Sequence, residues 1–261
     1  MWRYEWWRHV GRCYLDLQHL RMACEARIRM FPEDTPEDVL RLIRRYHSSL
    51  YDAEKWFLRE VSEMLKLHPL WRWCEAVKGL GPVAALTFLS FIDPEKADTA
   101  GKVKAYAGMV PGKARRSGQR VNVNFEFKGR VWLITRNVIM HRDPYYYPLY
   151  MQKKQYYLEN SRRVWDEKRQ EWVEWPPFKV ILENPLACPK YEECVKRLRG
   201  RAERLGRPPK KPPCKLHLDS TAKRWLAGLL LSHAAQLIRE AEGLPIDNFL
   251  KHKDYIPPKP H

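Results

Sequence analysis

Hydrophobic residues recur at steps of three and four positions along two N-terminal stretches, residues 6–28 and 39–64. This spacing places the apolar side chains on one face of an α-helix. Because Phe31 and Pro32 interrupt the pattern, we expect two long amphipathic helices joined as an antiparallel hairpin. Their apolar faces either pack within one chain or form the seam of a coiled-coil homodimer. The positions concerned are Trp6, Val10, Cys13, Leu17, Leu20, Cys24 and Ile28, then Val39, Ile43, Tyr46, Leu50, Ala53, Phe57, Val61 and Met64.

A second helical pattern begins at Leu70 and is interrupted by the turn Gly79-Leu80-Gly81, after which Pro82 opens another apolar helix. Proline is favoured at the first helical position, and glycine allows a tight turn close to a ligand. The pattern predicts a helix-hairpin-helix. Backbone N–H groups around Gly81 and Val83 would then face a phosphate, with Lys78 adding positive charge. An ordinary helical turn closed by glycine is the alternative interpretation.

Apolar residues alternate with polar ones over residues 121–127, which predicts a short strand in a small β hairpin. Helical spacing returns over residues 132–140 and 222–241. We therefore expect a mainly α fold with one small β hairpin. The predicted segments are a helical hairpin (1–69), a helix-hairpin-helix domain (70–160), a basic Cys/His insertion (161–218) and a C-terminal helix with its tail (219–261), packed on the core.

The chain of 261 residues carries a formal net charge of +17, and this charge is clustered. Residues 112–132 hold six Lys or Arg against one Glu, and residues 186–261 hold 16 basic against 8 acidic residues. Clustered positive charge is typical of proteins that bind nucleic acid.

The N-terminus lacks the pattern of a secretory signal, and the apolar run at 225–238 is too short to span a bilayer. We expect a cytoplasmic, nucleoid-associated protein with no membrane partner. Many Arg, Glu, Pro, Trp and Tyr residues with few Gly also suit a thermophilic host.

Five motifs occur in one order: the turn Gly79–Gly81, Asp93, the segment Ala105–Pro111, Ser117-Gly118 and the basic turn Lys128–Arg130. In this order they resemble the C-terminal domain of the bridge-RNA-guided insertion-sequence transposases, relatives of the Piv/MooV-type DNA invertases. The resemblance covers about the middle third of the chain well and the later helices loosely. It implies DNA binding within a recombinase, and a coiled coil ahead of the serine domain.

In that family the serine before the glycine is the nucleophile that attacks a DNA phosphodiester, a role that maps onto Ser117. The family also has an N-terminal RuvC-like domain with four acidic residues that hold metal. The segment before Leu70 does not resemble such a strand-rich fold, so the acidic half of the site is missing, and an active recombinase would borrow these carboxylates from another chain. A serine in an ordinary turn is the alternative interpretation of Ser117.

Cys188, Cys194, Cys214 and His217 have the spacing C-x5-C and C-x2-H on either side of a basic stretch. Three thiolates and one imidazole suit a tetrahedral, structural zinc ion. Free buried cysteines, or disulfides in a hyperthermophile, are the alternatives. No organic cofactor is expected.

The sequence thus predicts a DNA-binding protein that contacts the phosphate backbone, with catalysis not expected. The alternatives are a transposase or recombinase subunit that uses Ser117, and an RNA-binding or architectural component whose partner is a guide or structured RNA. The predicted DNA-binding residues are Lys78, Gly79, Gly81, Val83, Lys113, Arg115, Arg116, Arg120, Lys128, Arg130, Arg197, Arg199, Arg201, Lys210 and Lys211.

Overall fold

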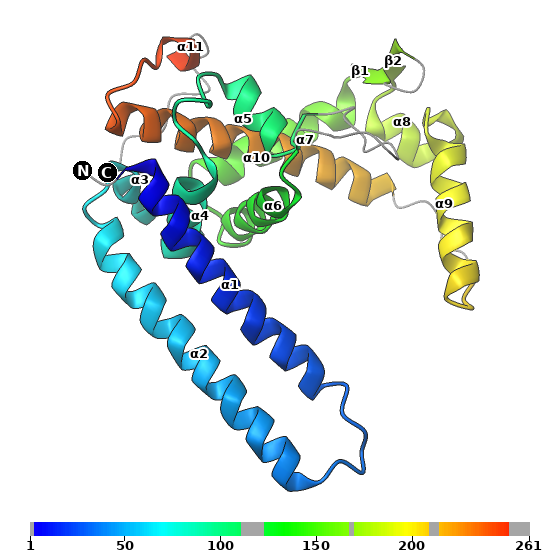
Figure 1. Ribbon diagram of the computed structural model, residues 1–261. Coiled ribbons are helices and arrows are strands. Elements are labelled where there is room, and N and C mark those ends of the chain that lie inside the picture. Colours follow the sequence, from blue (N-terminus) through cyan, green and yellow to red (C-terminus); the bar gives the residue numbers. More distant parts are fainter. Residues whose placement is uncertain (1–2, 111–122, 167–169, 209–213, 251–261) are drawn as a thin grey trace. The chain divides into compact units, whose positions relative to one another are not determined.

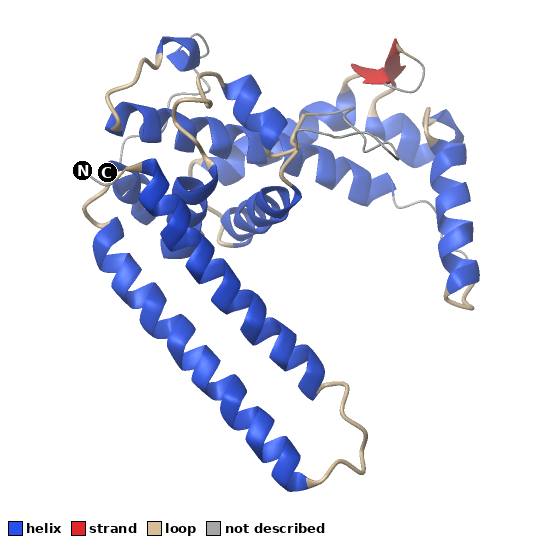
Figure 2. Cartoon of the chain, viewed as in Figure 1, coloured by secondary structure: helices blue, strands red, loops and turns tan. Residues whose placement is uncertain are grey.

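The computed structural model describes residues 3–110, 123–166, 170–208 and 214–250. These residues are mainly helical, with one two-stranded antiparallel sheet among them, which confirms the predicted fold class (Figures 1 and 2). The chain divides into two compact units. Unit 1 comprises residues 1–100 and 233–261, and unit 2 comprises residues 101–232.

Unit 1 contains the predicted helical hairpin. Its helices α1 (Tyr4–Ile28) and α2 (Glu37–Leu65) lie side by side (Figure 1). Both also pack against α4 (Pro82–Phe91), a short helix whose residues 84–90 are all buried. A helix that is apolar on all faces needs neighbours on every side, and α1 and α2 supply part of this cover. The end of α10 (Cys214–Ala241), from His233 onward, and the short α11 (Asp247–Leu250) complete unit 1.

The helix before the glycine turn is α3 (Pro69–Ala76), and His68 caps its N-terminus. The Leu70 N–H donates to His68 Nδ1 at 3.1 Å. Burial lowers the pKa of His68 to about 4, so the ring is neutral at physiological pH and can accept this hydrogen bond. The turn to α4 then passes through Gly79 at φ 93°, a left-handed conformation that favours glycine.

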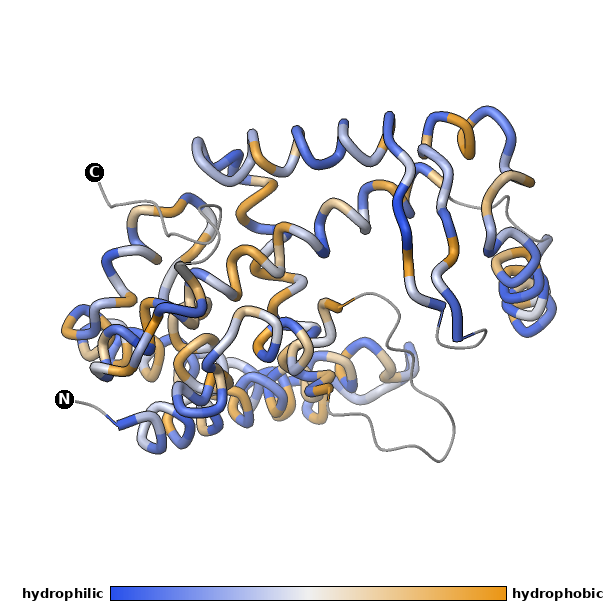
Figure 3. The backbone as a smooth tube through the Cα atoms, turned by 90° about the horizontal axis from the view of Figure 1, so that it is seen from above, coloured by the Kyte–Doolittle hydropathy of each residue, from blue (hydrophilic) through white to orange (hydrophobic). Residues whose placement is uncertain are grey.

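The described part of unit 2 consists of helices and one β hairpin. The strands β1 (Arg162–Asp166) and β2 (Glu171–Trp175) are antiparallel, with Val164 opposite Val173. Both strands are mostly hydrophilic, as Figure 3 shows. The helices are α5 (Ala100–Tyr106), α6 (Phe125–Met140), α7 (Tyr146–Glu159), α8 (Phe178–Glu183), the 3-10 turn η1 (Pro185–Ala187), α9 (Tyr191–Arg204) and α10 up to Ser232.

The strand predicted at residues 121–127 is wrong in its described part. The helix α6 begins at Phe125, and the Asn124 side chain caps it by accepting the Phe127 N–H at 2.9 Å. Phe127 is buried together with Val131 and Val138, so the helical spacing of apolar residues determines the structure here. The alternation at residues 123–127 was too short to distinguish strand from helix. The sheet forms instead at residues 162–175.

A search of the described residues for membrane-spanning segments found no helix long and apolar enough to cross a bilayer.

Candidate nucleic-acid interface

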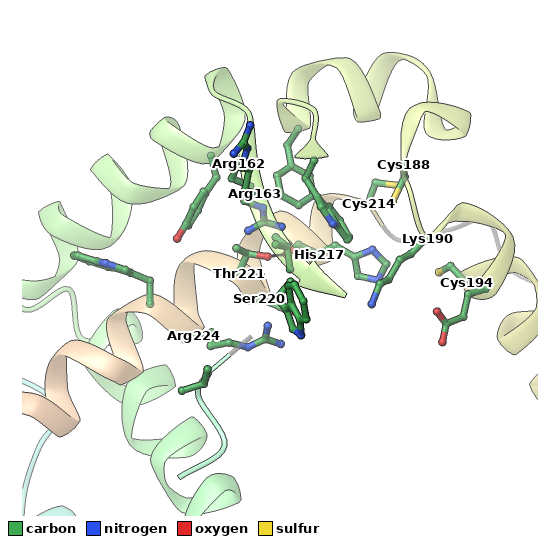
Figure 4. A pocket seen from close by; sticks show the side chains of 18 of the residues that line it. Arg162, Arg163, Cys188, Lys190, Cys194, Cys214, His217, Ser220, Thr221 and Arg224 are labelled. Atoms are coloured by element: carbon green, nitrogen blue, oxygen red, sulfur yellow. Dashed lines mark hydrogen bonds between the residues drawn. The ribbon is translucent and has the colours of Figure 1, made fainter. Parts of the chain in front are cut away.

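A cavity of about 990 Å³ lies within unit 2, between the β hairpin, the η1–α9 segment and the first half of α10 (Figure 4). Its lining is strongly basic, with six Lys or Arg and one Glu. Aromatic side chains from the hairpin and the helices supply much of the remaining wall. The basic residues are Lys104, Arg162, Arg163, Lys190, Arg197 and Arg224, and the aromatic ones are Tyr157, Trp165, Trp172, Trp175, Phe178, Tyr191 and Trp225.

Arg162, at the start of β1, is held by aromatic rings rather than by a carboxylate. Its guanidinium carbon lies 5.1 Å from the ring centroids of Tyr157 and Trp175 and 5.2 Å from that of Phe178. Burial lowers the pKa of Arg162, and the nearby charge of Arg224 lowers it further. Within the described ranges, Arg162 has no ion pair with any carboxylate.

Arg224 on α10 and Lys128 on α6 are two further cations that are partly buried. Burial lowers the pKa of each, and the positive charge of Arg224 contributes to the lowering at Lys128. Neither side chain forms an ion pair with a described residue. Unpaired cations in a partly buried position are unfavourable. An anion bound between them would remove that penalty.

The first turns of α10 direct several polar side chains toward the cavity. His217, Ser220, Thr221 and Arg224 follow one another at steps of three and one, and all line the cavity (Figure 4). The buried cluster of Phe178, Ile181, Cys214 and Leu218 packs this end of α10 against α8. A rigid helix therefore presents hydroxyl, imidazole and guanidinium groups to the same space.

The four predicted zinc ligands, Cys188, Cys194, Cys214 and His217, all line this cavity, although they come from three separate elements. The cysteines are free, and the thiols of Cys188 and Cys194 lie near enough to Cys214 to raise its pKa, after the larger effect of burial. Burial lowers the pKa of His217, and nearby Arg197 lowers it further. Among the residues that the structure describes, no three His, Cys, Asp or Glu side chains form a group ready to hold a metal ion.

The other predicted site residues are distributed over both units. Lys78, Gly79, Gly81 and Val83 belong to unit 1. Lys78 is exposed, and a Cβ atom added at Gly81 would meet nothing within 4 Å.

In unit 2, Arg197 lines the cavity, whereas Lys128, Arg130, Arg199 and Arg201 do not. Ser117, Lys113, Arg115, Arg116, Arg120, Lys210 and Lys211 lie outside the described residues.

Sequence reasoning missed Arg162, Arg163, Lys190 and Arg224. The segments 162–166 and 171–175 contain Val and Trp, which favour strands, but neither alternates polar with apolar residues, so the periodicity gave no strand signal for the first two. No local signal marks Arg224. Its importance comes from the lack of a carboxylate partner, which is a property of the fold.

Comparison with known proteins relates part of this chain to a protein family. Residues 73–135 match the family model described as Transposase IS116/IS110/IS902 family. This chain contains a transposase-related domain. The matched range runs from α3 through the glycine turn, α4 and α5 into α6, so it includes Lys128. No curated protein and no solved structure gave a match.

Proposed function

We propose that this transposase-related protein binds DNA through its phosphate backbone, with the unit 2 cavity as a principal contact. The observation that carries the proposal is that two partly buried cations of the cavity lining, Arg162 and Arg224, have no described carboxylate to neutralise them; Lys128 lies near Arg224 but does not line the cavity. A phosphate supplies the missing negative charge, and arginine matches its oxygens with two parallel N–H donors. The match to a transposase family supports DNA as the polyanion.

The glycine turn of unit 1 is the second proposed contact. The first turn of α4 follows Gly81 directly, and backbone N–H groups at a helix start favour a phosphate. The open space beside Gly81 supports close approach of a ligand to the backbone there. Lys78, exposed on the same turn, adds a positive charge. This contact is the helix-hairpin-helix function predicted from the sequence.

The variant Arg224→Gln tests the proposal, because it separates binding from stability. We expect affinity for duplex DNA to fall about tenfold at low salt, and the slope of log affinity against log salt to shrink by about one. The free energy of unfolding should stay equal or rise, since a desolvated, unpaired charge is removed.

The matched control is Arg59→Gln, an exposed arginine on α2 that pairs with Glu60. Fluorescence anisotropy with a labelled duplex at several salt concentrations measures affinity, and urea unfolding measures stability. An unchanged salt slope in Arg224→Gln would reject the cavity as a phosphate site.

We also propose that Cys188, Cys194, Cys214 and His217 hold a structural zinc ion, as their residue types predict. Their common position around one cavity supports this proposal, as does the sparse anchoring of α9, where Cys194 and Ala202 are the buried residues. Zinc would tie α9 to α10. Metal analysis is expected to find one zinc per chain, and its loss in Cys194→Ser. Purified protein without stoichiometric zinc would discard the site.

A recombinase subunit that uses Ser117 as nucleophile remains the alternative proposal, and Ser117 falls within the family match. Undiminished strand exchange by Ser117→Ala would remove it. The homodimer through the N-terminal helices, the guide or structured RNA partner and the nucleoid-associated location stay predictions.

A further inference from the structure

Two tryptophans face each other across the β hairpin of unit 2. Trp165 and Trp172 are register partners, and their ring centroids lie 5.6 Å apart at an interplanar angle of 67°. Trp172 is 65% exposed, whereas Trp165 is partly buried. Large indole rings are usually buried in folded proteins, and an exposed one next to a cavity commonly marks a binding surface.

The same two indoles line the cavity that contains Arg162 and Arg224. Aromatic surface and unneutralised cations therefore border one space. Arg163 and Trp165 are two residues apart on β1 and share one face of the strand, so the hairpin itself places a cation beside the indole pair. Arg162, on the other face of β1, and Arg224, on α10, border the same cavity. The lining contains six basic residues and one Glu, which favours an anionic ligand. The flat indole rings favour a ligand with a planar group that can stack on them.

From this juxtaposition we propose that an unpaired stretch of nucleic acid occupies the cavity, with a base stacked on Trp172 and Trp165 and its phosphate at Arg163 and Arg224. This inference rests on the proposed function and names its substrate class. In a duplex, both faces of each base are covered by neighbouring bases, so an indole can stack only on a base that has left the helix. Stacked aromatics beside a basic groove are the general means of binding single strands.

A purely structural role for the tryptophan pair explains the position of Trp165 but not the exposure of Trp172. A cross-strand aromatic pair stabilises a hairpin, and Trp165 suits this role because it is partly buried. Trp172 contributes little burial to the hairpin, since most of its surface is open to solvent. A ligand that covers Trp172 accounts for an exposed indole in the lining of a basic cavity.

The test compares three probes of equal length and sequence: single-stranded DNA, single-stranded RNA and a blunt DNA duplex. Anisotropy is measured at one salt concentration for the wild type, Trp172→Ala and Trp172→Phe. We expect Trp172→Ala to bind the single strands about tenfold more weakly, because one stacked base is worth about that factor. Binding to the duplex should not change. Trp172→Phe should retain most single-strand affinity. Whichever single strand binds more tightly identifies the source of the unpaired bases.

The matched control is Trp56→Ala, which removes another exposed indole, 56% exposed, from α2 in unit 1. It should leave all three affinities unchanged. Photocrosslinking of a bromodeoxyuridine oligonucleotide gives a second readout without a variant, and the crosslink should map to residues 162–175. Equal single-strand affinity in the wild type and Trp172→Ala, with no crosslink in the hairpin, would overturn the inference.

Failure of this inference is distinguishable from failure of the proposed function. If Trp172→Ala changes nothing while Arg224→Gln weakens duplex binding, the phosphate site stands and the base site is rejected. If Arg224→Gln also has no effect, the phosphate site is rejected as well.

Discussion

Replacing Glu54 with alanine is expected to lower the free energy of unfolding by about 3 kcal/mol, because it removes the closer carboxylate of the partly buried Arg21 and leaves that arginine only the 3.5 Å contact with Glu25. Glu54 lies on α2, with only 11% of its side chain exposed, and pairs with Arg21 Nε on α1, whose side chain is 18% exposed. The Tyr14 hydroxyl donates to Glu54 Oε1 at 3.2 Å, and Gln18 Nε2 donates to the same oxygen at 3.1 Å. One carboxylate thus satisfies three donors of the facing helix.

The pKa of Arg21 is raised, chiefly by its hydrogen bond to Glu54. The charged pair is therefore mutually favourable, and removing its acidic member exposes the part of the desolvation cost of Arg21 that the weaker contact with Glu25 does not offset. The double variant Arg21→Met with Glu54→Leu should recover most of the loss, because it removes both charges and fills the space with apolar atoms.

Glu60→Ala is the matched control on the same helix. Glu60 pairs with Arg59, but the two side chains are 52% and 71% exposed, so its removal should change stability by less than about 1 kcal/mol. Urea unfolding followed by circular dichroism measures each variant. A loss in Glu54→Ala no larger than that in Glu60→Ala would show that the interhelical network contributes nothing.

The hairpin of α1 and α2 was predictable because its pattern is local: apolar residues at helical spacing need only the sequence to be recognised. Glu54 was not predicted as buried, although it lies four residues after Leu50 and seven before Val61, on the same stripe. A polar residue on an apolar stripe can be buried only if the facing helix supplies donors. That condition depends on the register of two helices, which periodicity does not determine.

The candidate site was less predictable, for a different physical reason. Counting charges by segment identified basic clusters, but a cluster does not show which cations lack carboxylate neighbours. Arg162 and Arg224 are 62 positions apart in the chain, and only the fold of unit 2 brings them to one cavity. Cys188, Cys194, Cys214 and His217 were singled out by residue type and spacing, which are local properties of the sequence, and the structure brings them to that cavity.

Close packing of α1 on α4 supports the last prediction, that Gly11→Ala destabilises the protein by about 3 kcal/mol. Gly11 is buried on α1, where an alanine Cβ atom would lie 1.7 Å from Ser90 Oγ and 2.5 Å from Ser90 Cβ. A serine hydroxyl can rotate away, but Ser90 Cβ is fixed by the backbone of α4, so the two helices must separate. Separation also lengthens the 3.1 Å hydrogen bond from Ser90 Oγ to the Trp7 carbonyl. Overpacking of a buried contact costs about 1–3 kcal/mol, and this contact is at the severe end.

Gly129→Ala provides the control of opposite sign, since Gly129 lies within α6 and a Cβ atom there meets nothing within 4 Å. Alanine restricts the unfolded chain more than glycine does, so this variant should gain about 0.5–1 kcal/mol. Combining Gly11→Ala with Ser90→Gly removes the clash and should restore part of the loss, as a double-mutant cycle in urea unfolding would show. If Gly11→Ala raises the free energy of unfolding as Gly129→Ala does, Gly11 on α1 is not in direct contact with Ser90 on α4. The packing of α1 against α4 described above would then be incorrect.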